Sequence, residues 1–265
     1  MKLTLIDQIK ATNPVVLNIA NMVTPADVAN GLNVLGASPI MSTASEEASD
    51  LVKIAQAVTI NIGTVNANSF KQMQAVLMAA NGKVPLVLDP VACGASRYRS
   101  QVVSQLLADY QFTVIRGNAG EIAHLAGVDW QGHGIDAGDG NGDVTAIAKA
   151  CARKYHCITV LTGATDIITD GDEVNEVPFG TPLFAVHVGT GDMLSSMIGA
   201  FCAIEPNTLE AASTACLTFA LCGQAAAKTA TAPNAWYDAL LNQLYTLNHA
   251  TAQHLQTTLK EAFHA

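Results

Sequence analysis

Charge is scarce in this chain, and most of what is present is negative. Only 13% of the residues are charged, and 13 Lys and Arg stand against 22 Asp and Glu, for a formal net charge of −9. A protein that binds DNA or RNA neutralises phosphates with clustered cations, and the sequence contains no basic cluster. The composition therefore argues against a nucleic-acid partner.

Long apolar runs are missing as well. The longest, residues 193–204, is shorter than the ~18 apolar residues that a membrane-spanning helix needs. The opening residues MKLTLIDQIK are too polar, and their apolar stretch too short, for a secretory signal. We expect no membrane partner.

Cysteine motifs are also lacking. None of the six cysteines forms a CxxC pair or pairs with histidines at zinc spacing, and most have apolar neighbours. Buried, reduced thiols are the natural interpretation, and they are typical of a cytoplasmic protein. The seven histidines show no HxxxH spacing, and neither Ser196 nor Cys93 has a base at readable spacing, so no hydrolase triad is expected.

What the sequence does contain is apolar residues, half of the total, in strands that alternate with helices. Expected strands cover residues 15–19, 38–41, 58–62, 84–88, 112–115, 157–161 and 183–188, with a hairpin over 166–177. Expected helices cover residues 3–9, 24–35, 45–57, 68–81, 96–110, 120–126 and 144–155, and further helices follow from 192, broken around Pro206 and Pro233. This alternation predicts an α/β fold in which helices cover both faces of a mostly parallel sheet, as one domain over residues 1–265.

The stretch from residue 131 to 143 is rich in Gly and Asp and has some of the alternation of a calcium loop. Val144 stands where an EF-hand needs its turn glycine, and Ala150 stands where it needs its bidentate acid. We therefore interpret the stretch as a flexible loop that can cover a site.

Gly189-Thr190-Gly191-Asp192 lies between an apolar run and a long apolar helix. Glycines and a helix start together present unpaired N–H groups to an anion such as phosphate. Asp192 would then be a general base beside that nest. The alternative is that Asp192 is a helix N-cap, a role in which Asp is common.

Other polar or small residues stand where predicted strands end. Ligands of parallel α/β sheets bind beyond the carboxyl ends of the strands, so these residues are expected to converge. They are Asn21, Met41, Gly63, Thr64, Asp89, Arg116, Asn118, Thr162 and Asp192.

Two of these positions, and Glu121 close after a third, suggest phosphate chemistry. Asp89 and Glu121 are candidate carboxylates for Mg²⁺, and Arg116 is a candidate phosphate ligand. Each has a structural alternative: a turn-forming Asp, a capping box of Asn118 with Glu121, and a salt bridge of Arg116. The sequence has neither a Walker A loop nor a strand-linked GxGxxG, so the nest would carry much of the anion binding. An acidic base, an anion nest, carboxylates for Mg²⁺ and a cation together indicate phosphoryl transfer to an alcohol.

These residues resemble those of the ribokinase-like small-molecule kinases, and more closely the hydroxyethylthiazole kinase family of thiamine salvage. The blocks GLNVLGASPIM at 31–41 and IRGNAGEI at 115–122 are the most specific, whereas GTGD alone is not. Further similar blocks are residues 18–21, 61–64, 88–91 and 161–163.

The resemblance implies ATP- and Mg²⁺-dependent phosphorylation of the hydroxyl of 4-methyl-5-(2-hydroxyethyl)thiazole, in a homotrimer with sites between subunits. It implies that Asp192 is the base and that the amides from Gly189 to Gly191 hold the transferring phosphoryl group. The remaining roles that it implies are ATP binding by Arg116, Thr162, Asn118 and Gly191, Mg²⁺ binding by Asp89 and Glu121, and thiazole binding by Met41, Asn21 and Gly189.

Three alternatives stay open on the sequence. The chain could be another kinase of the superfamily, acting on hydroxymethylpyrimidine or pyridoxal. It could be the related dehydratase of hydrated nicotinamide cofactors, or a nucleotide-binding module without catalysis. A module would have no use for Asp192, so replacing that residue discriminates it from the enzymes.

Overall fold

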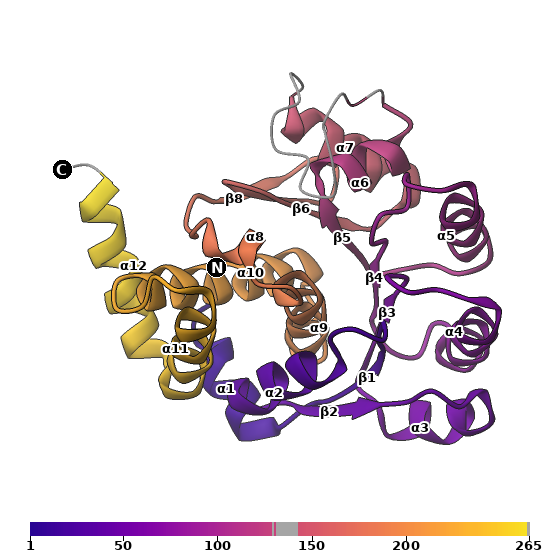
Figure 1. Ribbon diagram of the computed structural model, residues 1–265, viewed down its shortest axis with the longest axis horizontal. Coiled ribbons are helices and arrows are strands. Elements are labelled where there is room, and N and C mark those ends of the chain that lie inside the picture. The colour runs from indigo at the N-terminus through magenta and orange to yellow at the C-terminus, as the bar shows by residue number, and fades with distance from the viewer. Residues whose placement is uncertain (129, 131–142, 264–265) are drawn as a thin grey trace.

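One eight-stranded sheet runs through the protein (Figure 1). The computed structural model describes residues 1–128, 130 and 143–263. The strand order is β2-β1-β3-β4-β5-β6-β7-β8. The strands are β1 (Val15–Ile19), β2 (Ser38–Met41), β3 (Ala57–Asn61), β4 (Leu86–Asp89), β5 (Val114–Asn118), β6 (Ile158–Thr162), β7 (Asp166–Thr169) and β8 (Val174–Val177).

Strands β1 to β6 are all parallel, and β7 and β8 form the predicted antiparallel hairpin at one edge of the sheet. Gly171 takes the positive φ of 106° that the hairpin turn requires. The mostly parallel sheet of the sequence prediction is confirmed. It explains the near-continuous apolar strands, since a parallel sheet is buried on both faces.

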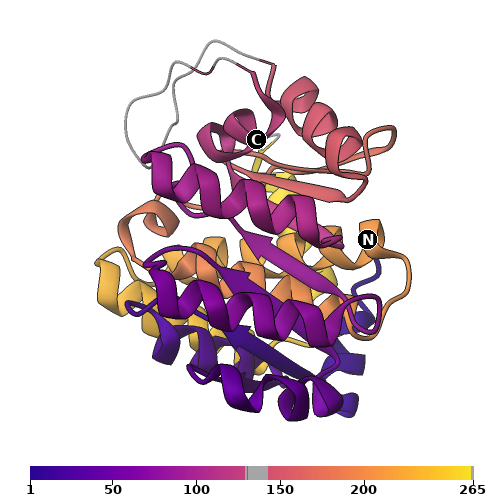
Figure 2. The same ribbon diagram turned by 90° about the vertical axis from the view of Figure 1, so that its right-hand side faces the viewer.

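Helices cover both faces of the sheet, as Figures 1 and 2 show from two directions. One face carries α3 (Ala48–Ile54), α4 (Ala67–Ala80), α5 (Arg97–Asp109), α6 (Ala119–Ala126) and α7 (Val144–Tyr155), with a short 3-10 turn η1 (Ser45–Glu47) before α3. The other carries α1 (Leu5–Thr12), α2 (Pro25–Leu35), α8 (Leu183–Val186), α9 (Thr190–Cys202), α10 (Thr208–Ala227), α11 (Pro233–Thr246) and α12 (His249–Phe263). Each layer has its own apolar core against the sheet.

The order of the strands reverses between β1 and β3. The chain crosses from β1 to β2 on one side, and every later strand lies on the other side of β1. A crevice opens at the carboxyl ends of the strands at such a reversal, and ligands of open α/β sheets bind there. Helix α9 packs against β1, β3 and β4 and reaches this point with its N-terminus.

Local signals behave as the sequence predicts at several helix ends. Asn118 caps α6. Asp143, which was predicted as part of a loop, caps α7 by accepting from the Ala146 N–H at 3.0 Å. Helix α2 ends at Gly36, which has φ 102°, in the left-handed region that glycine tolerates. The other residues of the predicted 131–143 loop lie outside the described part of the chain.

The strand predicted for residues 183–188 is wrong. Residues Leu183–Val186 form the short helix α8. The Phe184 ring packs edge-on against Trp236 at 5.1 Å and beside Phe219 at 4.8 Å. Of the apolar residues that suggested a strand, Phe184 packs against helices α10 and α11 instead of a neighbouring strand, whereas Val186 and Val188 are exposed.

The predicted 112–115 strand also needs correction, because β5 continues to Asn118 and so includes Arg116. The helix predicted for 45–57 consists of η1 and α3 and ends at Ile54. None of the helices in the described ranges has both the length and the apolar character needed to cross a membrane.

Candidate active site

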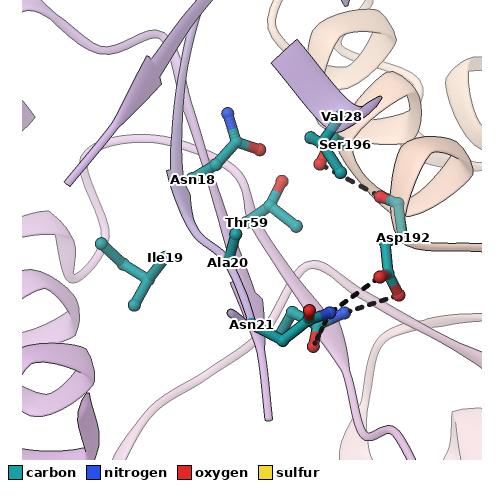
Figure 3. A pocket seen from close by; sticks show the side chains of 9 residues that line it. Asn18, Ile19, Ala20, Asn21, Val28, Thr59, Asp192 and Ser196 are labelled. Atoms are coloured by element: carbon teal, nitrogen blue, oxygen red, sulfur yellow. Dashed lines mark hydrogen bonds between the residues drawn. The ribbon is translucent and has the colours of Figure 1, made fainter. Parts of the chain in front are cut away.

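The carboxylate of Asp192 lies at the crevice between β1 and β3, held by three side chains, of which Figure 3 labels Asn21 and does not draw Thr24. The amide of Asn21 donates to Oδ2 at 2.7 Å, and the hydroxyl of Thr24 donates to the same oxygen. The amide of Asn61 donates to Oδ1 at 2.9 Å. Hydrogen bonds to a charged acceptor are among the stronger ones, so the carboxylate is held in one orientation.

The clamp itself is braced by further contacts. Asn61 Oδ1 accepts from the Gly63 N–H at 2.8 Å and from the Asn21 amide at 3.2 Å. Asn21 Oδ1 accepts from the Val23 N–H at 2.7 Å. The side chains of Asn21, Thr24 and Asn61 are all buried, so their positions are fixed by the fold.

Asp192 is not the N-cap of helix α9. The helix begins at Thr190, its N-cap is Gly189, and Asp192 sits in the first turn. The alternative in which this Asp caps the helix is therefore wrong. Its carboxylate points sideways, to residues that follow β1 and end β3.

The start of α9 has the features of an anion site. Gly189 has φ 97°, and a Cβ there would lie 2.8 Å from the Thr24 side chain, so only glycine fits this turn. The first N–H groups of a helix have no acceptor within the helix. They carry the positive end of the helix dipole beside the Asp192 carboxylate.

Arg116, near the end of β5, lies against this helix start. A Cβ on Gly191 would come within 2.5 Å of Arg116 Nη1, so the glycine makes room for the guanidinium. Nη2 of Arg116 donates to the Thr162 hydroxyl at 2.8 Å, and Nη1 lies 3.5 Å from Asp89 Oδ2. The structure thus brings together three of the predicted ATP residues, Arg116, Thr162 and Gly191. It also contains the salt bridge that was the alternative for Arg116.

Asp89 ends β4 and is completely buried. Ser195, on α9, donates to its Oδ2 at 2.7 Å. Burial raises the pKa of Asp89, and the charges of Asp192 and Glu121 add to that effect while Arg116 opposes it. Burial by itself lowers the pKa of Arg116. The negative charges of Asp89 and Glu121 have the larger combined effect, so the pKa of the guanidinium is raised.

These charges bear on whether the site suits a cation. The Asp89, Glu121 and Asp192 carboxylates all act through their charges on the Arg116 guanidinium. Within the described chain, Oδ1 of Asp89 is buried and has no hydrogen-bond partner. An unpaired carboxylate oxygen in an acidic cluster suits a hard divalent cation, whose other ligands can be phosphate and water. The described residues contain no ready-made cluster of three or more His, Cys, Asp or Glu around one point.

Glu121 has the structural role that was its alternative. Its Oε2 accepts from the Asn118 N–H at 2.8 Å while Asn118 Oδ1 accepts from the Glu121 N–H at 2.9 Å, which makes the capping box of α6. Oε1 accepts from the Ala92 N–H at 2.7 Å. Burial raises the pKa of Glu121, and these N–H donors oppose the shift. Both of its oxygens are thus already engaged by the backbone.

The three residues predicted to bind the thiazole take different places. Asn21 and Gly189 lie on either side of Thr24, close to Asp192. Met41 ends β2 and pairs in register with Asn18 of β1, so it lies further along the same edge of the sheet. It is half-buried and packs against the core on the α9 side.

Sequence reasoning missed three residues of the site. Thr24 stands at the start of the helix predicted for residues 24–35, but its side chain makes no cap and binds Asp192 instead. Asn61 ends a buried strand just as Asn21 follows one, and that shared position was the signal for it. Ser195 lies within an apolar helix, and nothing in its sequence context marks it.

Comparison with known proteins bears on this arrangement. A sequence model of the hydroxyethylthiazole kinase family matches residues 6–250. The chain is 57% identical over 237 residues to the hydroxyethylthiazole kinase of Limosilactobacillus fermentum, covering 89% of this chain and 92% of that protein.

Solved structures agree. The hydroxyethylthiazole kinase of Pyrococcus horikoshii OT3 superposes with a TM-score of 0.85 at 32% identity, over 93% of each chain. A ribokinase-like superfamily protein from Enterococcus faecalis V583 superposes with a TM-score of 0.63 at 19% identity, over 91% of this chain and 89% of that one, and so shares the fold. The chain is a kinase with a ribokinase-like fold, and it belongs to the hydroxyethylthiazole kinase family.

Proposed function

We propose that this protein transfers the γ-phosphoryl group of ATP to the hydroxyl of 4-methyl-5-(2-hydroxyethyl)thiazole, as a step of thiamine salvage. Family membership gives the reaction class. The observation that carries the chemistry is the Asp192 carboxylate, clamped by three donors beside the N-terminus of α9.

The clamp also assigns the working oxygen of the base. A carboxylate offers about four acceptor positions. Asn21 and Thr24 occupy Oδ2, and Asn61 occupies one position on Oδ1. Asp192 Oδ1 therefore keeps a position for the substrate hydroxyl and takes its proton. The alcohol oxygen then forms a bond to the γ-phosphorus, the bond to the bridging oxygen breaks, and ADP leaves.

The neighbouring residues serve the nucleotide in this proposal. The amides at Gly189, Thr190 and Gly191 hold the transferring phosphoryl group at the helix start. Arg116, positioned by Thr162 and by the space above Gly191, pairs with phosphate oxygens. Asn118 shapes the turn between β5 and α6, where it contacts ATP.

The acidic side of the site suits Mg²⁺. Asp89 would hold it through the unpaired Oδ1, and Glu121, whose oxygens already accept from backbone N–H groups, would hold it through water. When bound, the ion neutralises charge on the phosphates during transfer. Buried Asp89 orients the Arg116 guanidinium at the same time.

We also propose that a second copy of the chain completes the thiazole site, as in a homotrimer. Apolar side chains flank the clamp on both sides: Met22 and Val23 follow Asn21, and Val186 and Val188 precede Gly189. Met22 is 80% exposed and Val188 is 67% exposed. The cavity beside Asp192 has a volume of about 10 Å³, room for about one water and too little for a thiazole. An apolar patch beside an open site is typical of a surface that a partner covers.

The described cysteines are free and buried. That state fits the reducing cytoplasm in which we place the enzyme.

The test is ADP release with Mg·ATP and hydroxyethylthiazole, with hydroxymethylpyrimidine and pyridoxal in parallel. We expect turnover with the thiazole alcohol. Turnover only with another alcohol would keep the mechanism and change the substrate. No ADP release with any of the three alcohols would point to the dehydratase or to a binding role.

Asp192→Ala tests the base in the same assay. We expect kcat to fall by ~10²–10⁴, the usual contribution of a general base, while ATP still binds. Asp50→Ala is the control, because Asp50 is an exposed acid on α3, on the opposite face of the sheet. Normal turnover in Asp192→Ala would refute the assignment.

A further inference from the structure

A small cavity lies at the inner side of the Asp192 clamp, between the sheet and helix α9, and Asn21, Asn61 and Asp192 are among the residues that line it (Figure 3). Strands β1 and β3 line it with Asn18 and Thr59, and α9 lines it with Ser196. Its ligand-accessible volume is about 10 Å³. A cavity of roughly that size holds one water molecule and nothing larger.

Two buried polar atoms near this cavity lack a hydrogen-bond partner within the described chain. They are Asn18 Oδ1 and Thr59 Oγ1. The two residues are 2% and 3% exposed. They are register partners on adjacent parallel strands, so their side chains leave the sheet on the same face. Two such neighbours without a partner are unusual, since buried polar atoms are nearly always paired.

Ser196 supplies a third polar group from the opposite wall. Its hydroxyl donates to the Asp192 carbonyl at 3.2 Å, one turn back along α9. A hydroxyl oxygen also accepts hydrogen bonds, so this contact leaves Ser196 able to accept another.

We propose that one ordered water occupies this cavity and joins β1 and β3 to helix α9. The water accepts a hydrogen bond from the Thr59 hydroxyl and donates to Asn18 Oδ1 and to the Ser196 hydroxyl oxygen. Three partners are the usual number for a buried water. Asn18 Oδ1 and Thr59 Oγ1 then each have a hydrogen-bond partner, and each donor has an acceptor.

The donor set favours water over a cation. The three groups are a neutral amide and two neutral hydroxyls. The Asp192 carboxylate is turned to its own donors, and the acceptor position that remains on Oδ1 is the one proposed for the substrate hydroxyl. Three neutral oxygens do not replace the hydration shell of a metal ion. A buried water needs about three hydrogen-bond partners, which these groups supply.

The direct test is a high-resolution crystal structure of the protein with and without ATP. We expect one spherical density peak within hydrogen-bond distance of Asn18 Oδ1, Thr59 Oγ1 and the Ser196 hydroxyl in both. An empty cavity overturns the proposal. So does an anomalous peak there after a rubidium soak, because it would show a monovalent cation.

Variants at Thr59 give a second test, through the sign of the change in Tm. Val keeps the shape of Thr but has no hydroxyl. If the water is present, Thr59→Val removes one of its partners and lowers Tm. If the cavity is empty, the same change removes an unpaired buried hydroxyl and raises Tm, which overturns the proposal.

Thr59→Ser is the matched control. It keeps the hydroxyl, so its crystal structure is expected to retain the water that Thr59→Val weakens or loses. Equal occupancy in both variants would show that Thr59 does not hold the water. If Thr59→Val fails to fold, the Ser variant and the unaltered protein still decide between a filled and an empty cavity.

Discussion

Gly191 offers a way to move Arg116 without touching its chemistry. In the Gly191→Ala variant the new Cβ would lie 2.5 Å from Nη1 and 2.9 Å from Nη2 of Arg116. Ordinary contact begins at 3.4 Å, so the guanidinium has to retreat by about 0.9 Å. The backbone N–H of residue 191 stays in place, and so does the proposed anion nest.

The retreat has a calculable effect. The bond from Arg116 Nη2 to Thr162 is 2.8 Å long, and a movement of this size along the bond lengthens it to about 3.7 Å, beyond the range of a hydrogen bond. A hydrogen bond to a charged group contributes about 1.5–3 kcal/mol, which corresponds to a tenfold to hundredfold loss of kcat/KM for ATP. Gly to Ala within a helix favours folding by about 1 kcal/mol, so overall stability changes little.

The assay is steady-state kinetics with ATP as the varied substrate, alongside the Tm of each variant. Gly199→Ala is the control on the same helix, because the nearest atom to its Cβ is Thr59 Oγ1 at 3.2 Å, which needs to shift by only a few tenths of an ångström and is not part of the proposed ATP site. We expect Gly199→Ala to keep its kcat/KM for ATP. If Gly191→Ala keeps it as well, the position of Arg116 does not matter for ATP and the assignment fails.

Three further predictions follow from other parts of the molecule. Asn61→Leu removes the donor to Asp192 Oδ1. We expect kcat to fall about tenfold, the effect of ~1.4 kcal/mol, with KM for ATP unchanged. An unaltered kcat would show that Asn61 does not position the base. Burial raises the pKa of Asp166 to about 6, so the folded protein holds this proton more tightly than the unfolded chain, and stability falls as the pH rises from about 4 to 6. We expect the free energy of unfolding, measured with denaturant, to fall by about 1–3 kcal/mol less across this pH range in Asp166→Asn. If it falls equally in both proteins, Asp166 is not the cause of the pH dependence. Val188→Asp should lower the sedimenting mass and the activity together, whereas Met78→Asp, on the exposed side of α4, should change neither; a Val188→Asp protein of unchanged mass would count against the subunit interface.

The parallel part of the sheet was predictable because each buried strand is a short apolar run that ends at a polar or small residue. Val15–Ile19 and Ala57–Asn61 are examples, and both keep the predicted boundaries within one residue. Helix ends such as Gly36 followed from local backbone preferences. These signals are local, so no knowledge of the fold was needed.

The failures came where an apolar run had more than one way to be buried. Residues 183–188 read as a strand, yet Phe184 is covered by Trp236 and Phe219 from distant helices. A polar residue failed in the same way: Thr24 stands at the start of a predicted helix, yet its hydroxyl donates to a carboxylate that is 168 residues away in sequence. Local preference is weak compared with such tertiary contacts.

The sequence by itself determined the α/β class, the polar residues at the strand ends and the identity of Asp192 as the candidate base. Only the tertiary structure decided which of these residues meet. The reversal of strand order between β1 and β3 brings Asn21, Thr24 and Asn61 onto Asp192, and the packing of α9 sets Arg116 against Gly191. Spacing along the chain cannot reveal such contacts, because they depend on the order in which strands pair and on the helix that lies across them.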